Sequence, residues 1–248
     1  MKLLGSISKY LWFVKNTFYI IGYAVLALFL YDIIAEITLE GSPITGLGPI
    51  TLATPLDAII PFLSAFTVFY VFIFYPFVIY SLGYLMYIRP EKADKVFLSI
   101  LIVYIVAFLN YLLLPVKMIR PDPDKLPSDF LSRVMAKYYK EDLPVNCFPS
   151  LHAANSTLFA YWMSKAKPRF KILFWAIAIS VIISTLFVRQ HVMADEVYGF
   201  LLAYLVSWLI DRGFPDGKPV KEYWLPRAIF TLVLATAVAI FIILGYLP

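Results

Sequence analysis

The sequence predicts an all-α protein embedded in a membrane, and its composition and hydropathy pattern support this fold class. Hydrophobic residues occupy 62% of the 248 positions, charged residues occupy only 15%, and the mean hydropathy is +0.81. A soluble domain of this length could not bury so much apolar surface, so much of the chain must face lipid. No alternation of polar and apolar residues typical of a membrane barrel is visible, which leaves helices as the spanning elements.

Seven apolar stretches come close to the roughly 20 residues that a helix needs to cross a bilayer. They are about Thr17–Ile37, Ala58–Ile88, Val96–Pro115, Pro149–Met163, Ile172–Val188, Val192–Ile210 and Arg227–Leu247. The second is long enough to tilt or to carry a break near Pro76, and the short fourth and fifth leave room for an extension into the flanking loops. We expect one transmembrane domain over residues 1–248, with a core at about 17–212 and an additional C-terminal helix at about 227–247.

Two long loops separate these stretches. Glu40–Pro55 is rich in Gly, Pro and Thr and is expected to form turns. Lys117–Phe148 is polar, but apolar residues recur in it at helical spacing, namely Phe130, Leu131, Val134, Met135, Tyr138 and Tyr139, opposite Ser132, Arg133, Lys137 and Lys140. We predict a short amphipathic helix there, with Ser128 as N-cap and Asp129 in the first turn. It either lies flat on the membrane surface or packs as an ordinary loop helix.

The distribution of Lys and Arg predicts the orientation in the cell membrane. With the N-terminus in the cytoplasm, fourteen of the 21 lie on the cytoplasmic side and seven on the outer side. Lys2, Lys9 and Lys15 precede a first span that is longer than a signal-peptide core, so we expect a retained anchor. The net charge of +5 therefore does not indicate a nucleic-acid partner. The single cysteine, Cys147, excludes an intrachain disulfide and a thiolate metal cluster.

The chain has two histidines, and both fall at outer ends of predicted spans. His191 and Asp195 are four residues apart, so they share one face if a helix begins near His191. A carboxylate bonded to one ring nitrogen fixes the tautomer and leaves the other nitrogen free to attack an electrophile. The pair could equally be structural and close a helix end.

His152 follows Pro149 and Ser150 at the start of the fourth predicted span. A proline suits an early helical position, and the free N–H groups of a helix start favour an anion. Ser150 adds a hydroxyl group, and a protonated His152 could give its proton to a leaving oxygen. Alternatively, His152 is a packing or interfacial histidine.

Three cations lie next to these elements: Lys117, Arg120 and Arg189. Guanidinium groups bind phosphate oxygens in a bidentate manner and neutralise charge on a transferring phosphoryl group. Each cation by itself could be a residue that reaches from a span to the interface. Ionisable residues are scarce in such a chain, however, so their gathering at the outer ends of consecutive spans predicts a phosphate site.

These residues resemble the three-motif signature of the type 2 phosphatidic acid phosphatase superfamily: a Lys/Arg-Pro segment, then Pro-Ser-x-His, then Ser-Arg-x5-His-x3-Asp. The resemblance covers about Asp57–Ile210 and includes Arg120-Pro121 and Pro149-Ser150-Leu151-His152. It implies a six-helix core in which His191 attacks phosphorus, Asp195 orients His191, and His152 is the general acid. It also implies a phosphohistidine intermediate formed without a metal or another cofactor.

The sequence departs from this signature at three places. Leu113 occupies the position of the first-motif lysine, and Lys117 is the nearest lysine. Ser184-Thr185 stands in place of the third-motif Ser-Arg, with Arg189 two residues before the histidine, and Leu151 replaces a glycine. The branch that contains the inositol phosphorylceramide synthases is more similar over Phe148–His152, Arg189–His191 and Leu56–Phe62. These departures bear on which cations hold the phosphate and on whether the acceptor is water.

Two enzymatic functions and one alternative follow. The first is a lipid phosphatase or diphosphatase that cleaves a lipid phosphate or diphosphate at the outer membrane face. The second is a phosphotransferase that passes the phosphoryl group to an alcohol, as the synthases do. The third, a transporter or scaffold for anionic lipids, leaves His191 and Asp195 without a role, and no internal repeat typical of many transporters is visible. A serine protease is disfavoured because Ser150 and His152 are two residues apart on one helix. The lipid tail and the oligomeric state stay open.

Overall fold

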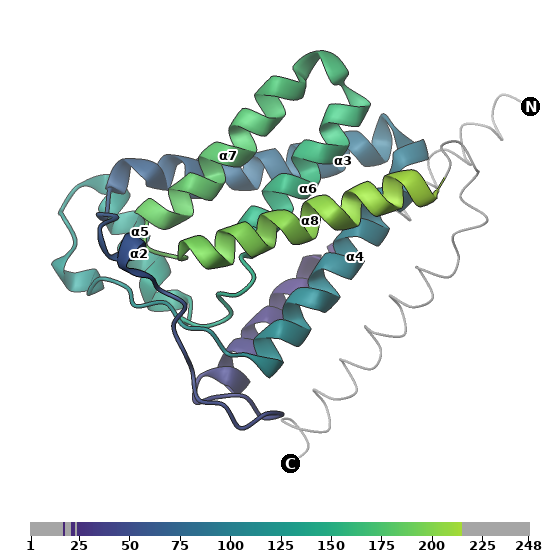
Figure 1. Cartoon of the computed structure of the whole chain (residues 1–248). Coiled ribbons are helices and arrows are strands. Elements are labelled where there is room, and N and C mark those ends of the chain that lie inside the picture. The colour runs from purple at the N-terminus through teal and green to yellow at the C-terminus, as the bar shows by residue number, and fades with distance from the viewer. Residues whose placement is uncertain (1–16, 18–20, 23, 215–248) are drawn as a thin grey trace, which may run out of the picture.

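Helices account for the regular secondary structure of the described residues. The computed structural model describes residue 17, residues 21–22 and residues 24–214 (Figure 1). Residues 24–38 are helical, and within the described ranges no strand forms. Four helices are long and apolar enough to cross a membrane: Ser64–Tyr87, Glu91–Leu113, Pro168–Phe187 and Met193–Gly213. These spans establish an all-helical membrane protein, while the predicted helix at about 227–247 lies outside the described residues.

Figure 1 labels the helices in chain order, and short 3-10 or π-helical turns connect several of them. The α-helices are α2 (Pro55–Ala58), α3 (Phe74–Tyr87), α4 (Pro90–Leu113), α5 (Phe130–Glu141), α6 (Leu151–Ala166), α7 (Lys171–Phe187) and α8 (Met193–Gly213). The 3-10 turns are η1 (Ser64–Phe66), η3 (Pro123–Lys125) and η4 (Pro168–Phe170), and the π-helical segment is η2 (Val68–Ile73).

Helix α6 is the central element of the bundle, surrounded by α3, α4, α7 and α8 (Figure 1). Thirteen of its 16 residues are buried, among them Ser156 and Thr157. A 16-residue helix is about 24 Å long, shorter than the hydrocarbon core. Because α6 faces protein and not lipid, it can be short and can carry small polar residues. It begins two residues later and ends three residues later than the predicted fourth span.

The regular α-helix of the second predicted span is interrupted near Pro76. Of the two predicted alternatives, a tilt or a break, the structure shows the break. The segment η2 is π-helical and leads directly into α3, of which Pro76 is the third residue. Proline has no N–H group, so the carbonyl of Phe72, four residues earlier, has no α-helical donor. Wider π-helical turns commonly accommodate such an interruption.

The predicted amphipathic helix exists as α5, but two details of the prediction were wrong. Its N-cap is Asp129 and not Ser128, because the Asp129 carboxylate accepts hydrogen bonds from the Ser132 N–H (3.0 Å) and hydroxyl (2.6 Å). Ser132 consequently belongs to the buried face, whereas Phe130 is 61% exposed. The Tyr139 hydroxyl donates to the carbonyl of Val188 at 2.5 Å, so α5 packs over one end of the bundle.

The long helices run up and down, so the chain elements that carry the two histidines meet at one end. Helices α4 and α7 end where α6 and α8 begin, and α2 and α5 cover this end (Figure 1). We call it the histidine end. The far end holds the α3–α4 turn, the α6–α7 turn and the end of α8. The helical segment 24–38 packs on α4 through Ile34, Ala107 and Tyr111.

Candidate active site

His191 and Asp195 face each other where the α7–α8 loop enters α8. The Nδ1 atom of His191 lies 3.4 Å from Oδ2 of Asp195, and the same oxygen accepts the N–H of Val192 at 3.1 Å. Both side chains are buried. Burial alone would lower the pKa of His191, but the hydrogen bond to Asp195 and the charges of Glu196 and Asp195 raise this pKa above its ordinary value. The imidazole therefore has a carboxylate behind Nδ1, and Nε2 is the nitrogen left for a reactant.

His152 is the second residue of α6 and lies beside His191. The two ring centroids are 5.9 Å apart, with an angle of 60° between the ring planes. The rings of Tyr70 and Phe74 each lie 4.5 Å from the His152 ring and hold it in place. Its Nε2 atom is buried and makes no hydrogen bond within the described part of the chain. An unpartnered ring nitrogen aimed into a protein interior points to a ligand or a reacting group.

The starts of α6 and α8 are joined through backbone contacts, which sets the spacing of the two imidazoles. The N–H of Ser150 donates to the carbonyl of Asp195 at 3.1 Å. Gly199, one turn further along α8, has no side chain, and a Cβ there would collide with the carbonyl oxygen of Ser150. Ser150 itself is fully buried and caps α6, its hydroxyl oxygen accepting the N–H of Ala153 at 3.2 Å. Ser150 does not line the cavity beside the histidines, and its predicted phosphate contact stays a prediction.

Arg120 is the predicted phosphate-binding cation that reaches the site. Its guanidinium contacts Asp142 twice, through the carboxylate and the backbone carbonyl, each at 2.6 Å. It also lies over the ring of Tyr139, 5.5 Å from the centroid. The side chain is only 8% exposed, and its Nε atom has no hydrogen-bond partner among the described residues. One donor of this cation is therefore unused while its charge is balanced by Asp142.

The other two predicted cations point elsewhere. Arg189 has a positive φ of 53°, and its Nη1 atom donates to the carbonyls of Asp57 at 2.7 Å and Ile60 at 3.1 Å. Lys117 is exposed, and its backbone N–H donates to Ile50 at 2.8 Å. Neither side chain lines the cavity beside the histidines. Arg189 anchors the α7–α8 loop to α2 instead.

Asp57 is a residue at the site to which reasoning from residue types assigned no role. Its Oδ1 atom accepts the N–H of Met193 at 2.8 Å, and Oδ2 accepts the N–H and hydroxyl of Thr54 at 2.8 and 2.7 Å. Burial would raise the pKa of Asp57, but these bonds from Thr54 and Met193 lower it below its usual range. The Thr-x-x-Asp spacing could have revealed the start of α2. The bond to Met193, 136 residues away, left no signal in the sequence.

A cavity of about 270 Å³ opens beside the two histidines. Its polar lining comes from the helical segment 24–38, η2, α4, α6 and the loops of the histidine end. It includes Tyr31, Asp32, Tyr70, Tyr104, Arg120, Asp142, Asn146, His152, Asn155, Gln190 and His191. Four atoms of this lining are buried without a hydrogen-bond partner among the described residues: Arg120 Nε, Asn146 Oδ1, His152 Nε2 and Gln190 Nε2. Buried polar atoms normally find partners, so their gathering around one cavity indicates a polar ligand.

Glu196 is a second buried carboxylate beside His191. It is 3% exposed, neither carboxylate oxygen makes a hydrogen bond among the described residues, and its charge acts on His191. The sequence shows Glu196 next to Asp195 but does not show that α8 would bury both. Within the part of the chain that the structure describes, no cluster of three or more His, Cys, Asp or Glu side chains is arranged to hold a metal ion.

Comparison with known proteins places these residues in a family. An uncharacterized protein of Methanocaldococcus jannaschii is 27% identical over 143 residues, and the match spans 57% of this chain and 58% of that protein. No solved structure matches the chain. A family model described as the PAP2 superfamily matches residues 95–217, about half of the chain, and this region contains both histidines, Asp195 and Arg120. Through residues 95–217 the chain belongs to the PAP2 superfamily, the family of the type 2 phosphatidic acid phosphatases.

Proposed function

We propose that the protein is a membrane lipid phosphatase or diphosphatase that uses His191 as its nucleophile. One observation carries the proposal: two imidazoles from separate helix starts lie 5.9 Å apart, and Asp195 lies behind one of them. Membership of the PAP2 superfamily supports a reaction at a phosphoester or phosphoanhydride. The unpartnered atoms around the cavity support a polar reacting group between the rings.

The first half of the reaction transfers the phosphoryl group to the protein. Nε2 of His191 attacks phosphorus, a nitrogen–phosphorus bond forms, and the bond from phosphorus to the leaving oxygen breaks. Asp195 holds the Nδ1 proton and stabilises the positive ring that results. His152 gives a proton to the leaving lipid alcohol or lipid phosphate. Arg120, through its unused Nε donor, is positioned to bind a phosphoryl oxygen.

The second half releases phosphate. His152, now without its proton, takes a proton from water, and the water oxygen bonds to phosphorus while the nitrogen–phosphorus bond breaks. The phosphohistidine is thereby returned to a neutral imidazole. The chain's own residues carry both steps: the nucleophile, its carboxylate and the acid–base group come from α8, the loop before it and the first turn of α6.

The placement in the membrane belongs to the same proposal. We assign the N-terminus to the cytoplasm and the histidine end to the extracytoplasmic side of the cell membrane, on the charge distribution of the sequence. The first predicted span completes a six-helix core with α3, α4, α6, α7 and α8, and the helix at about 227–247 adds a seventh. The lipid tail stays in the bilayer while the head group reaches the cavity laterally.

The test replaces the nucleophile. His191→Ala in detergent-purified, full-length protein should abolish phosphate release from a panel of lipid phosphates and diphosphates, because the substitution removes the attacking nitrogen. Lys137→Gln, a change on the exposed side of α5, is the matched control and should keep the wild-type rate. Undiminished release by His191→Ala would rule out the mechanism. Addition of a chelator should leave the wild-type rate unchanged, and complete loss of activity would contradict the metal-free chemistry.

A second candidate, transfer of the phosphoryl group to an alcohol, is favoured by the composition of the cavity. Asp32 and Asp142 line it together with tyrosine hydroxyls and with Asn146, whose Oδ1 atom lacks a partner among the described residues. Carboxylates and amides of this kind bind hydroxyl groups of a polyol. Incubation with a lipid donor and candidate alcohols, followed by mass spectrometry, separates the two reactions. A new phosphate ester of the added alcohol indicates transfer, whereas free phosphate without such an ester indicates hydrolysis.

A further inference from the structure

A second cavity of about 460 Å³ lies between α3 and α7, on the outside of the bundle. Phe72, Pro76 and Phe77 line one wall, and Leu173 and Ile177 line the other. Leu173 is 52% exposed and Phe72 is 47% exposed, so the groove is open to the surroundings. It shares no lining residue with the cavity beside the histidines. The groove is therefore a feature separate from the candidate active site.

The break at Pro76 places residues of η2 and α3 along this groove, and its walls are almost entirely apolar. Both walls belong to helices long and apolar enough to span the membrane, Ser64–Tyr87 and Pro168–Phe187. A groove of this kind inside a bilayer is surrounded by hydrocarbon and not by water. The occupant that matches its lining is a lipid acyl chain.

One end of the groove is cationic. Lys167 lines it, donates a hydrogen bond to the Tyr80 hydroxyl at 3.0 Å and lies 4.1 Å from the centroid of the Tyr84 ring. These contacts hold the ammonium group at the mouth of the groove, and the remaining N–H donors of an ammonium group can bind an anion. Lys167 is thus oriented before any ligand arrives.

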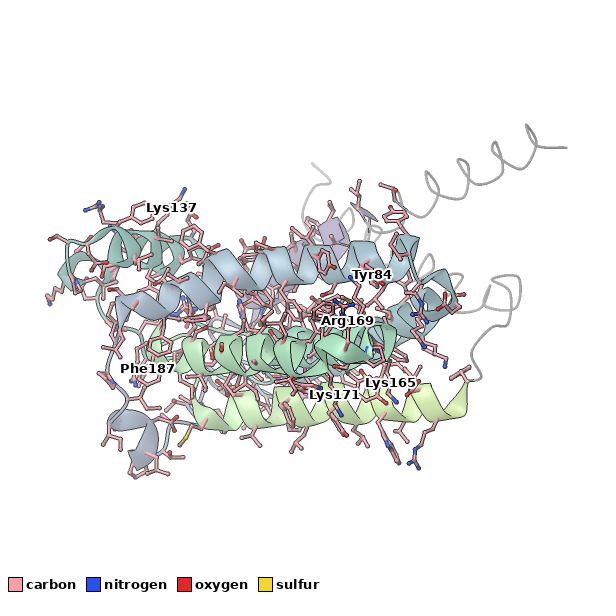
Figure 2. All side chains as sticks on the ribbon, turned by 90° about the horizontal axis from the view of Figure 1, so that it is seen from above. Tyr84, Lys137, Lys165, Arg169, Lys171 and Phe187 are labelled. Carbon is pink, nitrogen blue, oxygen red and sulfur yellow. The ribbon has the colours of Figure 1, made fainter. Side chains whose placement is uncertain are left out.

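Three further cations lie close to Lys167 in the sequence, at the far end of the bundle. Figure 2 shows Lys165, Arg169 and Lys171 near Tyr84, at the opposite end from Phe187 and Lys137. Among the described residues, Lys165 pairs with Asp211 at 2.8 Å, whereas Lys167, Arg169 and Lys171 have no ion pair with a carboxylate. Their positive charge is complementary to a head group with net negative charge.

We propose that this groove binds a phospholipid with a net negative head group, from the leaflet at the far end of the bundle. One acyl chain lies between α3 and α7, and the head-group phosphate contacts Lys167 and Arg169. The leaflet is the one opposite the histidines, so this lipid is not the substrate. This proposal does not depend on the catalytic one, because bilayer lipids surround the groove in either case. The positive charge at its mouth selects lipids with a negative head group.

Native mass spectrometry of the full-length protein, titrated with phosphatidylglycerol or with phosphatidylcholine of the same chains, tests the proposal. Wild-type protein should bind phosphatidylglycerol about fivefold more tightly or better, since each cation near the surface contributes about a factor of five. Lys167→Gln should lose most of this preference, and Lys167→Arg should restore it. Leu173→Trp, which fills the groove, should weaken the binding of both lipids.

Lys137→Gln, at the other end of the molecule, is the matched control and should leave both affinities unchanged. Unaltered melting temperatures exclude unfolding as the cause of any loss, and the restored preference in Lys167→Arg provides a second check. Equal binding of the two lipids by the wild-type protein, or a preference that survives Lys167→Gln, would show annular lipid only and overturn the proposal. Phosphate release in detergent should be unaffected by Lys167→Gln, because no groove residue lines the catalytic cavity.

Discussion

His191 has two buried carboxylates as neighbours, and their charges determine when its ring is protonated. Asp195 contacts Nδ1 directly at 3.4 Å, while Glu196 acts through its charge, and together they raise the pKa of His191 above its ordinary value despite burial. A protonated imidazole cannot attack phosphorus. The rate should therefore begin to fall at a higher pH than for an ordinary histidine, and it should decrease further as the pH falls through the raised pKa.

This leads to a prediction on pH dependence. Asp195→Asn replaces the charged acceptor that raises the pKa of His191 by a neutral amide, so the acid limb of kcat/KM should move to lower pH. The maximal rate should also fall by roughly 10²–10⁴-fold, because the amide no longer stabilises the positive ring. Glu196→Gln should shift the limb in the same direction without removing the hydrogen bond. If both variants keep the acid limb of the wild-type pH–rate profile, this role of the carboxylates is contradicted. Glu141→Gln, on the exposed side of α5, is the control and should leave the profile unchanged.

At the scale of elements, the starts of α6 and α8 are joined to each other and together position the residues of the site. The Ser150 N–H donates to the Asp195 carbonyl, and Gly199 allows α8 to approach the Ser150 carbonyl so closely that a Cβ would collide with it. On the other side, α2 holds the same loop through Asp57 and Arg189. Backbone contacts therefore position both imidazoles, which is a more rigid arrangement than one that rests on side chains alone.

Gly199→Ala tests this arrangement. The added methyl group should push the two helix starts apart, lower stability by about 1–3 kcal/mol and reduce activity at least tenfold, because His152 and His191 no longer meet at the same distance. Gly83→Ala is the matched control: it adds the same methyl group to α3, where no atom lies within 4 Å, and should be neutral or slightly stabilising. Melting temperature and phosphate release are the two measurements. Equal behaviour of the two variants would show that close approach at Gly199 does not matter.

At the scale of the whole molecule, the alternating helix directions put the candidate active site at one end and a group of cations at the other. Lys137 lies at the histidine end, whereas Lys171 lies at the far end (Figure 2). Both side chains are exposed, and the native thiol, Cys147, is buried. In the orientation that we propose from the positive-inside distribution, the far end lies in the cytoplasm. The molecule would then carry out its reaction on one side of the membrane and contact anionic lipid on the other.

Cysteine labelling in intact cells checks this orientation. A membrane-impermeant maleimide should label Lys137→Cys directly and Lys171→Cys only after permeabilisation. The wild-type protein, whose single thiol is buried, is the background control. Labelling in the opposite order would invert the topology and place the active site in the cytoplasm.

The hydropathy of neighbouring residues was sufficient to predict much of the fold. The predicted span Ile172–Val188 matches α7 (Lys171–Phe187) to within one residue at each end, because the apolar run is bounded by charged residues, Lys171 before it and Arg189 after it. Helix α4 begins six residues before the predicted Val96. Lys92 and Lys95 belong to it and are buried, and Lys95 lies 3.7 Å from Asp211 of α8. A prediction from hydropathy leaves such lysines out of a span, since it takes no account of a distant carboxylate such as the one that lies beside Lys95.

By itself the sequence determined the membrane class, the apolar stretches from which the described spans form, and the pairing of His191 with Asp195, because each of these depends on residues that are neighbours in the chain. Only the tertiary structure decided which cations reach the cavity. Arg120 lines it, whereas Arg189 is bound by the carbonyls of Asp57 and Ile60, about 130 residues away in sequence. A guanidinium group can bind either a phosphate or a carbonyl oxygen, so its role depends on which acceptor the fold brings to it.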